Sequence, residues 1–266
     1  MVDYHVHTTF SDGEKTPEEV INLAVSLGIE KLAITDHFDA FDPGLSRDQK
    51  TTGELLRHFD KIRNLAAGSS ITVYCGIETC TDESGHLRVE RECKSACDII
   101  ITSPHYIEGS YPFRRGEYFL DAYWQAYKKK LLLMAEGEGD VLGHPEGYLP
   151  IGQMLGEGTT YEGRQEICRK ISESYFDPPF IQELGKRLKK SGKAYELHGA
   201  TKTPREWVVE ALAKQDVLFS PGSDAHNVNI LGKNERAIEL VKKYNLHLYE
   251  PGRGCTSRNK IDKIGK

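Results

Sequence analysis

The chain has 266 residues, of which 38% are hydrophobic and 28% are charged, as is usual for a soluble globular protein. No apolar run approaches the ~20 residues that cross a bilayer, and the N-terminus lacks the basic-then-apolar pattern of a signal peptide. A net charge of −5, from 35 basic and 40 acidic residues, argues against general binding of nucleic acid. We therefore expect a cytoplasmic enzyme.

Short apolar runs rich in β-branched residues recur along the chain, and they predict strands that are covered on both faces. These runs are residues 2–7, 31–37, 71–78, 98–105, 140–144, 194–198 and 216–226. Helical patterns lie between them. Because strands alternate with helices, we expect a parallel sheet, open or closed.

Several helices have recognisable ends. Thr16 and Glu19 form a capping box with Pro17 at the first helical position, and Gly28 ends that helix. The same device is predicted at residues 203–206. Further helices are predicted at residues 116–135, from Asp177 toward Gly192, and at 233–244. Residues 38–53 and 145–165 exceed a normal connection, which favours functional lids or mobile segments.

The six cysteines form no paired CxxC blocks. They are Cys75, Cys80, Cys93, Cys97, Cys168 and Cys255. Cys93 and Cys97 are four residues apart, which is helical spacing. We interpret all six as reduced thiols rather than as zinc ligands or disulfide partners.

Every strand-like run ends in, or is followed by, a histidine or a carboxylate. In chain order these residues are His5 and His7, Asp36 and His37, Glu78, His105, His144, Glu196 and His198, and Asp224 and His226. In a parallel α/β barrel the strand ends share one face, where active sites lie. Because residues i and i+2 of a strand point the same way, both His5 and His7 are expected to face the barrel mouth.

Imidazole and carboxylate donors suit Zn²⁺, Fe²⁺ or Mn²⁺ rather than Ca²⁺ or Mg²⁺ alone. The candidate ligands are His5, His7, Asp12, His37, Glu78, His105, His144, Asp224 and His226. One ion with an open position needs about three protein ligands, so these candidates divide among two or three divalent ions, with Glu78 as a natural bridge. A lone strand-end histidine is more often a hydrogen-bonded structural residue, but a coincidence at so many strand ends is hard to explain that way.

The other histidines test this interpretation. His58 is predicted at the surface of a helix, His86 in a polar loop and His247 beyond the last helix, and none of them is expected to bind metal. His198 has the right position for the site, and it either contacts the substrate or supports a ligand.

The ordered motifs resemble those of the PHP superfamily, the polymerase-and-histidinol-phosphatase domains, over residues 1–244. They are HxHT…SDG (5–13), TDH (35–37), GIE (76–78), SPH (103–105), GHP (143–145) and GSDAH (222–226). The resemblance implies a distorted (β/α)7 TIM-like barrel with a trinuclear metal site, and we expect one domain over residues 1–266. The short basic stretch at 258–266 predicts a flexible, solvated tail. It assigns the first ion to His5, His7, Glu78 and Asp224, the second to Glu78, His105 and His144, and the third to Asp12, His37 and His226.

Stand-alone members of this length resemble histidinol-phosphate phosphatases, enzymes of the penultimate stage of histidine synthesis. We therefore expect a phosphatase that converts L-histidinol phosphate to L-histidinol and phosphate, with Glu78, Asp224 and His226 as catalytic residues. A water that bridges two cations loses its proton near neutral pH, and the resulting hydroxide is expected to attack phosphorus.

The substrate-binding candidates are chosen for phosphate recognition, because arginine forks match phosphate oxygens. They are Arg164, Arg115 and Arg114, with His198 as a further candidate. We expect a small phosphate ester as partner, with no membrane and no nucleic acid. Two stretches depart from the family pattern: ELHG places His198 where an asparagine is expected, and the segment after His105 differs.

Three alternatives stay open at this point. The first is a phosphoesterase that acts on nucleotides or short oligonucleotides, since fold alone does not choose the substrate. The second is an amidohydrolase that cleaves C–N bonds, although that group often uses a lysine carboxylate as bridge and no strand-end lysine is present. The third is a regulatory metal binder without catalytic activity.

Overall fold

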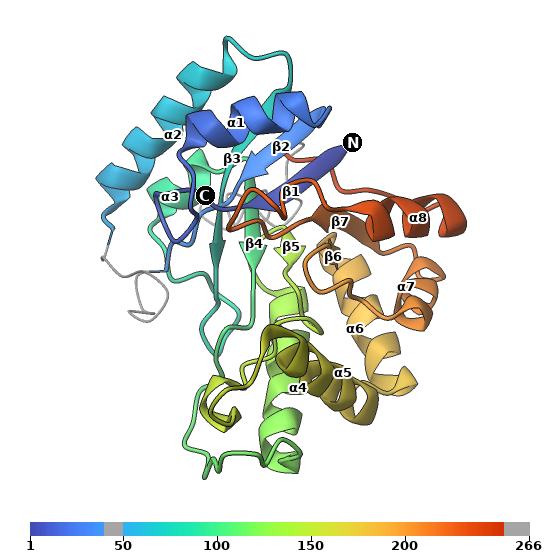
Figure 1. The fold of residues 1–266 in the computed structure, drawn as a ribbon. Coiled ribbons are helices and arrows are strands. Elements are labelled where there is room, and N and C mark those ends of the chain that lie inside the picture. The colour runs from blue at the N-terminus through green and yellow to red at the C-terminus, as the bar shows by residue number, and fades with distance from the viewer. Residues whose placement is uncertain (40–49, 253–266) are drawn as a thin grey trace, which may run out of the picture.

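Seven parallel strands form one sheet in the computed structural model, which describes residues 1–39 and 50–252 (Figure 1). Neighbours in sequence are neighbours in the sheet, in the order β1 to β7. The strands are β1 (Val2–Val6), β2 (Lys31–Ile34), β3 (Thr72–Thr79), β4 (Ile99–Thr102), β5 (Val141–Leu142), β6 (Ala194–His198) and β7 (Leu218–Gly222).

The segment after β7 returns to β1 and nearly closes the sheet. Ala225 forms a parallel bridge with Val6, and the backbone N–H of Asp224 donates to the carbonyl of His5 at 2.8 Å. The structure thus confirms the predicted distorted (β/α)7 TIM-like barrel. Five strands end earlier than predicted: β1 at Val6, β2 at Ile34, β4 at Thr102, β5 at Leu142 and β7 at Gly222. His37 still forms an isolated parallel bridge with Glu78 of β3.

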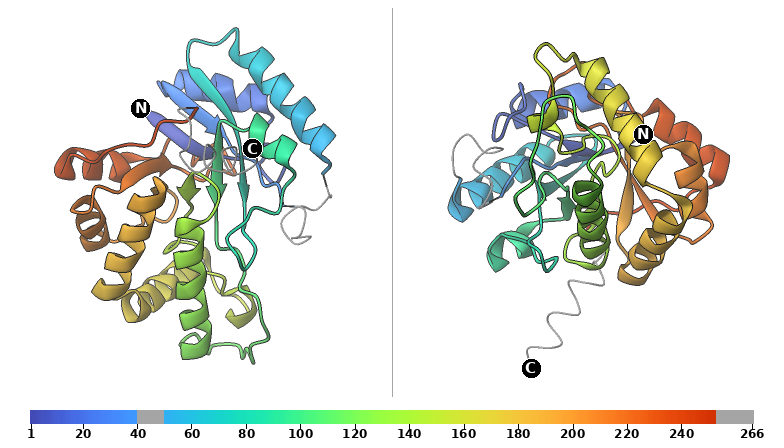
Figure 2. Two further views of the ribbon diagram at one scale, coloured as in Figure 1. Left: turned by 180° about the vertical axis from the view of Figure 1, so that it is seen from behind. Right: turned by 90° about the horizontal axis from the view of Figure 1, so that it is seen from below.

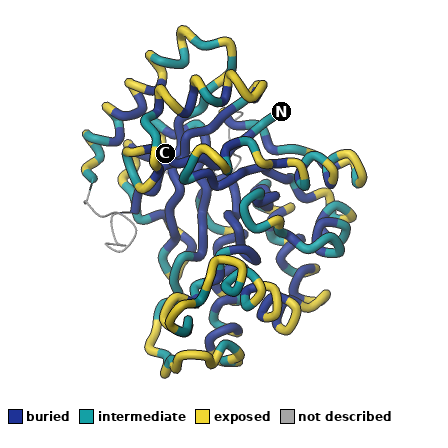
Figure 3. The backbone as a smooth tube through the Cα atoms, in the orientation of Figure 1, coloured by how far each residue is buried: buried dark blue, intermediate teal, exposed yellow. Residues whose placement is uncertain are grey.

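Helices surround the sheet in all three views (Figures 1 and 2). They are α1 (Pro17–Ser26), α2 (Thr52–Ala66), α3 (Arg91–Ala96), α4 (Asp121–Glu136), α5 (Tyr161–Tyr175), α6 (Pro178–Ser191), α7 (Glu206–Ala213) and α8 (Glu235–Tyr244), with a short 3₁₀ turn at Gly152–Met154. Apolar side chains of α4 and α6 pack against the outside of the barrel, and the strands are largely buried (Figure 3).

Local signals explain several helix ends. The side chain of Thr16 accepts from the backbone N–H of Glu19, and the Glu19 side chain accepts in return, which confirms the capping box of α1. Asp177 caps α6, and Gly192 ends it with a left-handed φ of 75°.

Three helix predictions were wrong. α4 begins at Asp121 and not at residue 116, and α5 begins at Tyr161, inside the predicted 145–165 loop, where the Thr160 side chain caps it. Residues 203–206 are no capping box, because Thr203 pairs with His198 through its backbone. The N-cap residue of α7, Arg205, makes no side-chain cap hydrogen bond within the described part of the chain.

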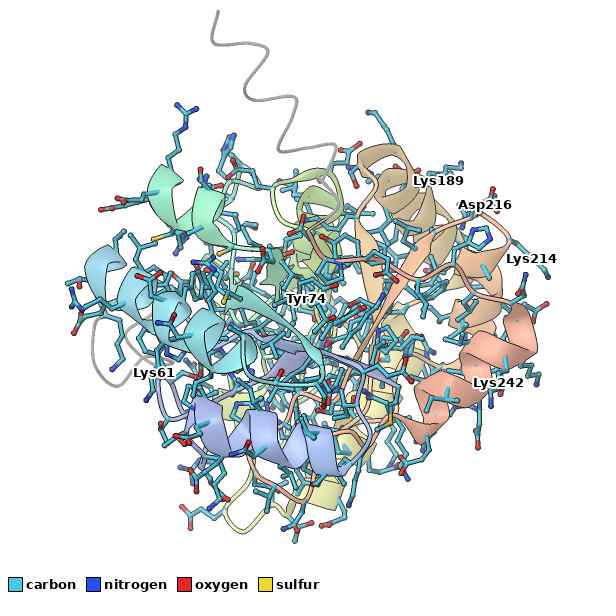
Figure 4. The ribbon with its side chains drawn as sticks, turned by 90° about the horizontal axis from the view of Figure 1, so that it is seen from above. Lys61, Tyr74, Lys189, Lys214, Asp216 and Lys242 are labelled. Atoms are coloured by element: carbon cyan, nitrogen blue, oxygen red, sulfur yellow. The ribbon has the colours of Figure 1, made fainter. Side chains whose placement is uncertain are left out.

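The two ends of the barrel differ in character. The arrowheads of β4 and β5 point to the end where α5 lies (Figure 1). At the opposite end, Tyr74 lies near the middle of the view and packs edge-to-face on Tyr4, with ring centroids 6.0 Å apart (Figure 4). Charged side chains lie at the periphery of that view, among them Lys61, Lys189, Lys214 and Lys242.

Three further observations bear on the sequence predictions. Among residues 1–39 and 50–252, every helix is too short or too polar to span a bilayer. The cysteines at 75, 80, 93, 97 and 168 are buried, and those at 75, 80, 93 and 168 are free thiols. Cys255, the tail at 258–266 and most of the predicted lid at 38–53 lie outside the described residues.

Candidate metal centre

The carboxylate of Glu78, near the end of β3, lies at the centre of a group of histidines. Glu78 is 1% exposed. Its nearest ring nitrogens belong to His144 at 2.8 Å, His37 at 2.9 Å, His105 at 3.1 Å, His5 at 3.4 Å and His7 at 3.5 Å. These histidines come from β1 and from the segments after β1, β2, β4 and β5, so the barrel mouth gathers them from distant parts of the chain.

Local backbone geometry makes this approach possible. His5 and His7 share one face of the first strand run because side chains alternate along a strand. Gly222 lets β7 come close: a Cβ atom there would lie 2.5 Å from Cβ of His5 and 2.6 Å from Oε1 of Glu196. His144 and Asp224 have positive φ angles of 26° and 55°, a backbone conformation that is uncommon for residues other than glycine.

The structure brings all nine predicted ligands together at this end of the barrel. Three groups have donor atoms within 4.8 Å of one another: His5, His7, Glu78 and Asp224; His7, Asp12, His37 and His226; and His37, Glu78 and His105. The first group is the predicted quartet. In the second group, His7 joins the predicted Asp12, His37 and His226. In the third group, His37 stands with Glu78 and His105 where His144 was predicted, although His144 still lies 2.8 Å from Glu78.

The donor set of the first group fits a divalent cation. The atoms His5 Nε2, His7 Nε2 and Asp224 Oδ1 are buried and have no hydrogen-bond partner among the residues that the structure describes. Asp224 Oδ1 lies 3.4 Å from His5 Nε2 and 3.1 Å from His7 Nε2. Donors around a tetrahedral zinc ion lie about 3.4 Å apart, because each bond is about 2.0–2.2 Å long. A cation would therefore supply the partner that these atoms lack.

Electrostatics keep the acids of the centre ionised. Burial raises the pKa of Glu78, but His105, His37 and His5 outweigh it and hold that pKa well below its ordinary value. For His5, burial lowers the pKa, but Glu196, Asp224 and Glu78 raise it well above the ordinary value. Burial and the neighbouring His37 and His226 lower the pKa of His7 to about 4.

Glu196, on β6, supports two of the predicted ligands. Its Oε1 accepts from Nδ1 of His5 at 2.6 Å, and its Oε2 accepts from the backbone N–H of His144 at 2.5 Å. A carboxylate behind a histidine sets which ring nitrogen faces a metal. The sequence marked Glu196 as a strand-end acid but assigned it no role.

Asp36 organises the segment that carries Ser11 and Asp12. Its carboxylate accepts from the backbone and side chain of Thr8, both at 2.7 Å, from Ser11 Oγ at 2.6 Å and from His58 Nε2 at 2.9 Å. The prediction that His58 lies at the surface was wrong, since it is 8% exposed. His58 shares the inward face of α2 with Leu55 and Ile62, and this helical spacing could have revealed its burial.

The remaining histidines, His198, His86 and His247, differ in how far they are buried. The side chain of His198 is fully buried, with Nδ1 at 2.6 Å from Thr201 Oγ1 and Nε2 at 3.0 Å from Asp224 Oδ2. This geometry favours support of Asp224 over contact with a substrate. His86 and His247 are exposed and lie outside the three groups of described residues.

The candidate arginines also differ. Arg114 and Arg115 are exposed and lie 3.6 Å from Glu117 and 2.5 Å from Glu157, respectively. Arg164, on α5, places its guanidinium 5.4 Å from the ring centroid of Tyr148. The Tyr148 ring in turn packs edge-on against His144 and His198, with centroids 5.6 and 5.3 Å apart. Arg164 is thus linked to the centre through one aromatic ring.

A family model for the PHP domain matches residues 3–184. The chain belongs to the PHP family. Two strands of the PHP barrel, β6 and β7, lie beyond the matched stretch and supply Glu196, His198 and Gly222.

Several curated proteins are similar to this PHP chain. It is 24% identical over 254 residues to a probable histidinol-phosphatase of Thermotoga maritima, and this match covers 92% of this chain and 93% of that protein. It is 27% identical over 157 residues to the histidinol-phosphatase of Lactococcus lactis, covering 58% of this chain. It is 22% identical over 241 residues, or 91% of this chain, to the DNA polymerase/3′-5′ exonuclease PolX of Bacillus subtilis. The matches span 56% of the L. lactis protein and 37% of the B. subtilis protein.

Among solved structures, the chain resembles histidinol phosphate phosphatase from L. lactis complexed with zinc, L-histidinol and phosphate. The TM-score is 0.66 at 20% sequence identity, over 94% of this chain and 95% of that one. A histidinol phosphatase structure from Listeria monocytogenes gives a TM-score of 0.61 at 16% identity. These likenesses show a shared fold.

Proposed function

We propose that this PHP-family protein is a metal-dependent phosphoesterase whose divalent ions are held by the nine residues at the barrel mouth. The observation that carries the proposal is the position of Glu78, whose carboxylate lies within 3.5 Å of ring nitrogens from His5, His7, His37, His105 and His144. A buried carboxylate shared by so many neutral or cationic rings is a natural bridge between ions. Zn²⁺, Fe²⁺ and Mn²⁺ suit this donor set.

The bound ions would supply a Lewis acid that polarises the phosphate and lowers the pKa of a coordinated water. The chain's own residues determine where the phosphate approaches. His5, His7 and Glu78 are almost fully buried, whereas the side chains of Asp12 and His226 are 38% and 34% exposed. We therefore infer that the phosphate enters on the side of Asp12 and His226, and that the buried residues hold the ions from the side that faces the protein interior.

Arg164 is our first candidate for holding the outer phosphate oxygens, with Arg115 and Arg114 as further candidates. Its link through Tyr148 to His144 and His198 favours it over the other two, which pair with exposed acids. Glu78, Asp224 and His226 would form the catalytic part of the site as ligands next to the reacting phosphate. His198 we place behind Asp224.

L-Histidinol phosphate is the leading substrate. The T. maritima relative named for this activity aligns over nearly the whole chain, and the L. lactis enzyme of the same fold binds L-histidinol and phosphate. The net charge of −5 also favours a small ester over a polyanion. A phosphoesterase acting on nucleotides is the second candidate, because the B. subtilis exonuclease–polymerase aligns over 91% of the chain.

A substrate panel tests the proposal. Metal-loaded protein is offered p-nitrophenyl phosphate, L-histidinol phosphate, a dinucleotide and an N-acyl amide, and product release is measured as kcat/KM. We expect the highest kcat/KM for L-histidinol phosphate. A higher value for the dinucleotide would favour the second candidate, and cleavage of the amide alone would refute phosphoester hydrolysis.

A further inference from the structure

His198, the last residue of β6, connects Asp224 to the loop that follows β6. Its Nε2 lies 3.0 Å from Asp224 Oδ2, and its Nδ1 lies 2.6 Å from Thr201 Oγ1 and accepts from the backbone N–H of Thr201 at 3.3 Å. Its side chain is fully buried. We propose that His198 is a positioning residue that fixes Asp224 as a ligand through one oxygen. This inference rests on the proposed metal-binding function.

The partners of the ring determine where its proton lies. The Thr201 backbone N–H can only donate, so Nδ1 must present a lone pair to it. The Asp224 carboxylate can only accept, so Nε2 must carry the proton. The opposite tautomer would set a ring lone pair against the carboxylate at 3.0 Å. Both neighbours therefore require the Nε2–H form of His198.

This tautomer divides the two oxygens of Asp224 between two tasks. Oδ2 accepts from His198, while Oδ1 lies 3.4 Å from His5 Nε2 and 3.1 Å from His7 Nε2. Oδ1 is buried and lacks a hydrogen-bond partner among residues 1–39 and 50–252. A metal ion is therefore offered one oxygen of Asp224 in a set orientation, and chelation through both oxygens is opposed.

The other side of the ring is held by a second loop. Thr201 Oγ1 also lies 2.9 Å from Thr203 Oγ1. Gly147 lies three residues after the predicted ligand His144 and packs closely against Thr201, since a Cβ atom at Gly147 would lie 2.3 Å from Thr201 Oγ1. His198 thus joins the β5 and β6 loops to Asp224, the second residue after β7.

Two substitutions of His198 test the hydrogen bonds of its two ring nitrogens separately. His198→Gln places an amide N–H donor near the position of Nε2, whereas His198→Asn restores only an acceptor near Nδ1. Outer hydrogen-bond partners of metal ligands typically change metal affinity by about 10–100-fold. We expect His198→Asn to weaken Zn²⁺ binding by about that factor and to change the visible spectrum of the Co²⁺ form, and His198→Gln to restore both. The exposed-loop variant His86→Asn serves as control.

Zn²⁺ affinity and stoichiometry are measured by chelator competition. Equal Zn²⁺ affinity and an unchanged Co²⁺ spectrum in His198→Asn would overturn the inference while leaving the proposed function intact, as would equal losses in both variants. If the unaltered protein binds no divalent ion, the proposed function itself fails, and the inference fails with it.

A second measurement does not depend on how the variants fold. ¹⁵N-labelled unaltered protein, loaded with Zn²⁺, reports by NMR which nitrogen of each histidine ring carries the proton. We expect the His198 ring to show a protonated Nε2 and a bare Nδ1. A proton on Nδ1 alone would overturn the inference.

Discussion

Glu196 Oε1 lies 2.6 Å from Nδ1 of His5, although the two residues are 191 positions apart in the chain. The other oxygen of the same carboxylate accepts from the backbone N–H of His144 at 2.5 Å. One buried acid on β6 therefore aims the ring of one candidate ligand and holds the backbone of another. It is one of several links between the late strands of the barrel and the early ones.

The first prediction concerns this link. Glu196→Gln replaces one acceptor oxygen by an N–H₂ group, which must face either the N–H of His144 or the Nδ1 of His5. Either arrangement disturbs a ligand, so Zn²⁺ affinity should fall by about 10–100-fold in chelator competition. Glu166→Gln, on the exposed side of α5 beside Arg169, is the matched control. Equal affinities in the two variants would contradict the assigned role of Glu196.

The second prediction concerns protons released on metal binding. Burial lowers the pKa of His226, but Asp12 and Asp224 outweigh it and raise that pKa to about 9. His226 must lose its proton to bind a cation, so metal uptake at pH 7–8 should release at least one proton, and affinity should fall as the pH drops below about 9. His7, with a pKa of about 4, should release none. Calorimetric titrations in buffers of different ionisation enthalpy measure the release, and a heat independent of the buffer would refute it.

The third prediction concerns phosphate recognition. Arg164→Ala should raise KM for L-histidinol phosphate by about 10–100-fold, because a hydrogen bond to a charged group contributes about 1.5–3 kcal/mol. Metal content should stay unchanged, as metal analysis would show. Arg114→Ala and Arg115→Ala, at exposed arginines paired with Glu117 and Glu157, should change KM far less. Unaltered kinetics in Arg164→Ala would remove this residue from the substrate site.

The fourth prediction concerns stability. His58→Ala leaves the buried carboxylate of Asp36 without its partner at 2.9 Å and should lower the free energy of unfolding by about 1–3 kcal/mol in urea at pH 7. His86→Ala, at a side chain that is 68% exposed, should have almost no effect.

This effect should also depend on pH in one direction. Burial raises the pKa of Asp36, but His58 and its other partners lower it below the ordinary value. The stabilisation is therefore complete above the unfolded pKa of about 3.9 and is lost as the pH falls below it. The difference between His58→Ala and the unaltered protein should shrink in acid, and a difference that grows there would contradict the assignment.

Much of this protein is determined by its sequence alone. The alternation of strand and helix patterns predicted a parallel sheet, and the family resemblance of the strand-end motifs predicted a barrel. The rule that strands of a parallel barrel end on one face predicted that His5, Glu78, His105 and Asp224 would meet. Local chemistry was also readable, as in the capping box at Thr16. These predictions succeed because periodicity and capping depend on residues close together in the chain.

Only the tertiary structure decided which distant groups touch. The pairing of Glu196 with His5, the division of the Asp224 oxygens by His198 and the hydrogen bond of His58 to Asp36 each join segments far apart in sequence. The start of α5 at Tyr161 likewise contradicted a glycine-rich pattern typical of a loop. Such contacts depend on how helices and loops pack around the closed sheet, and residue spacing does not encode that packing.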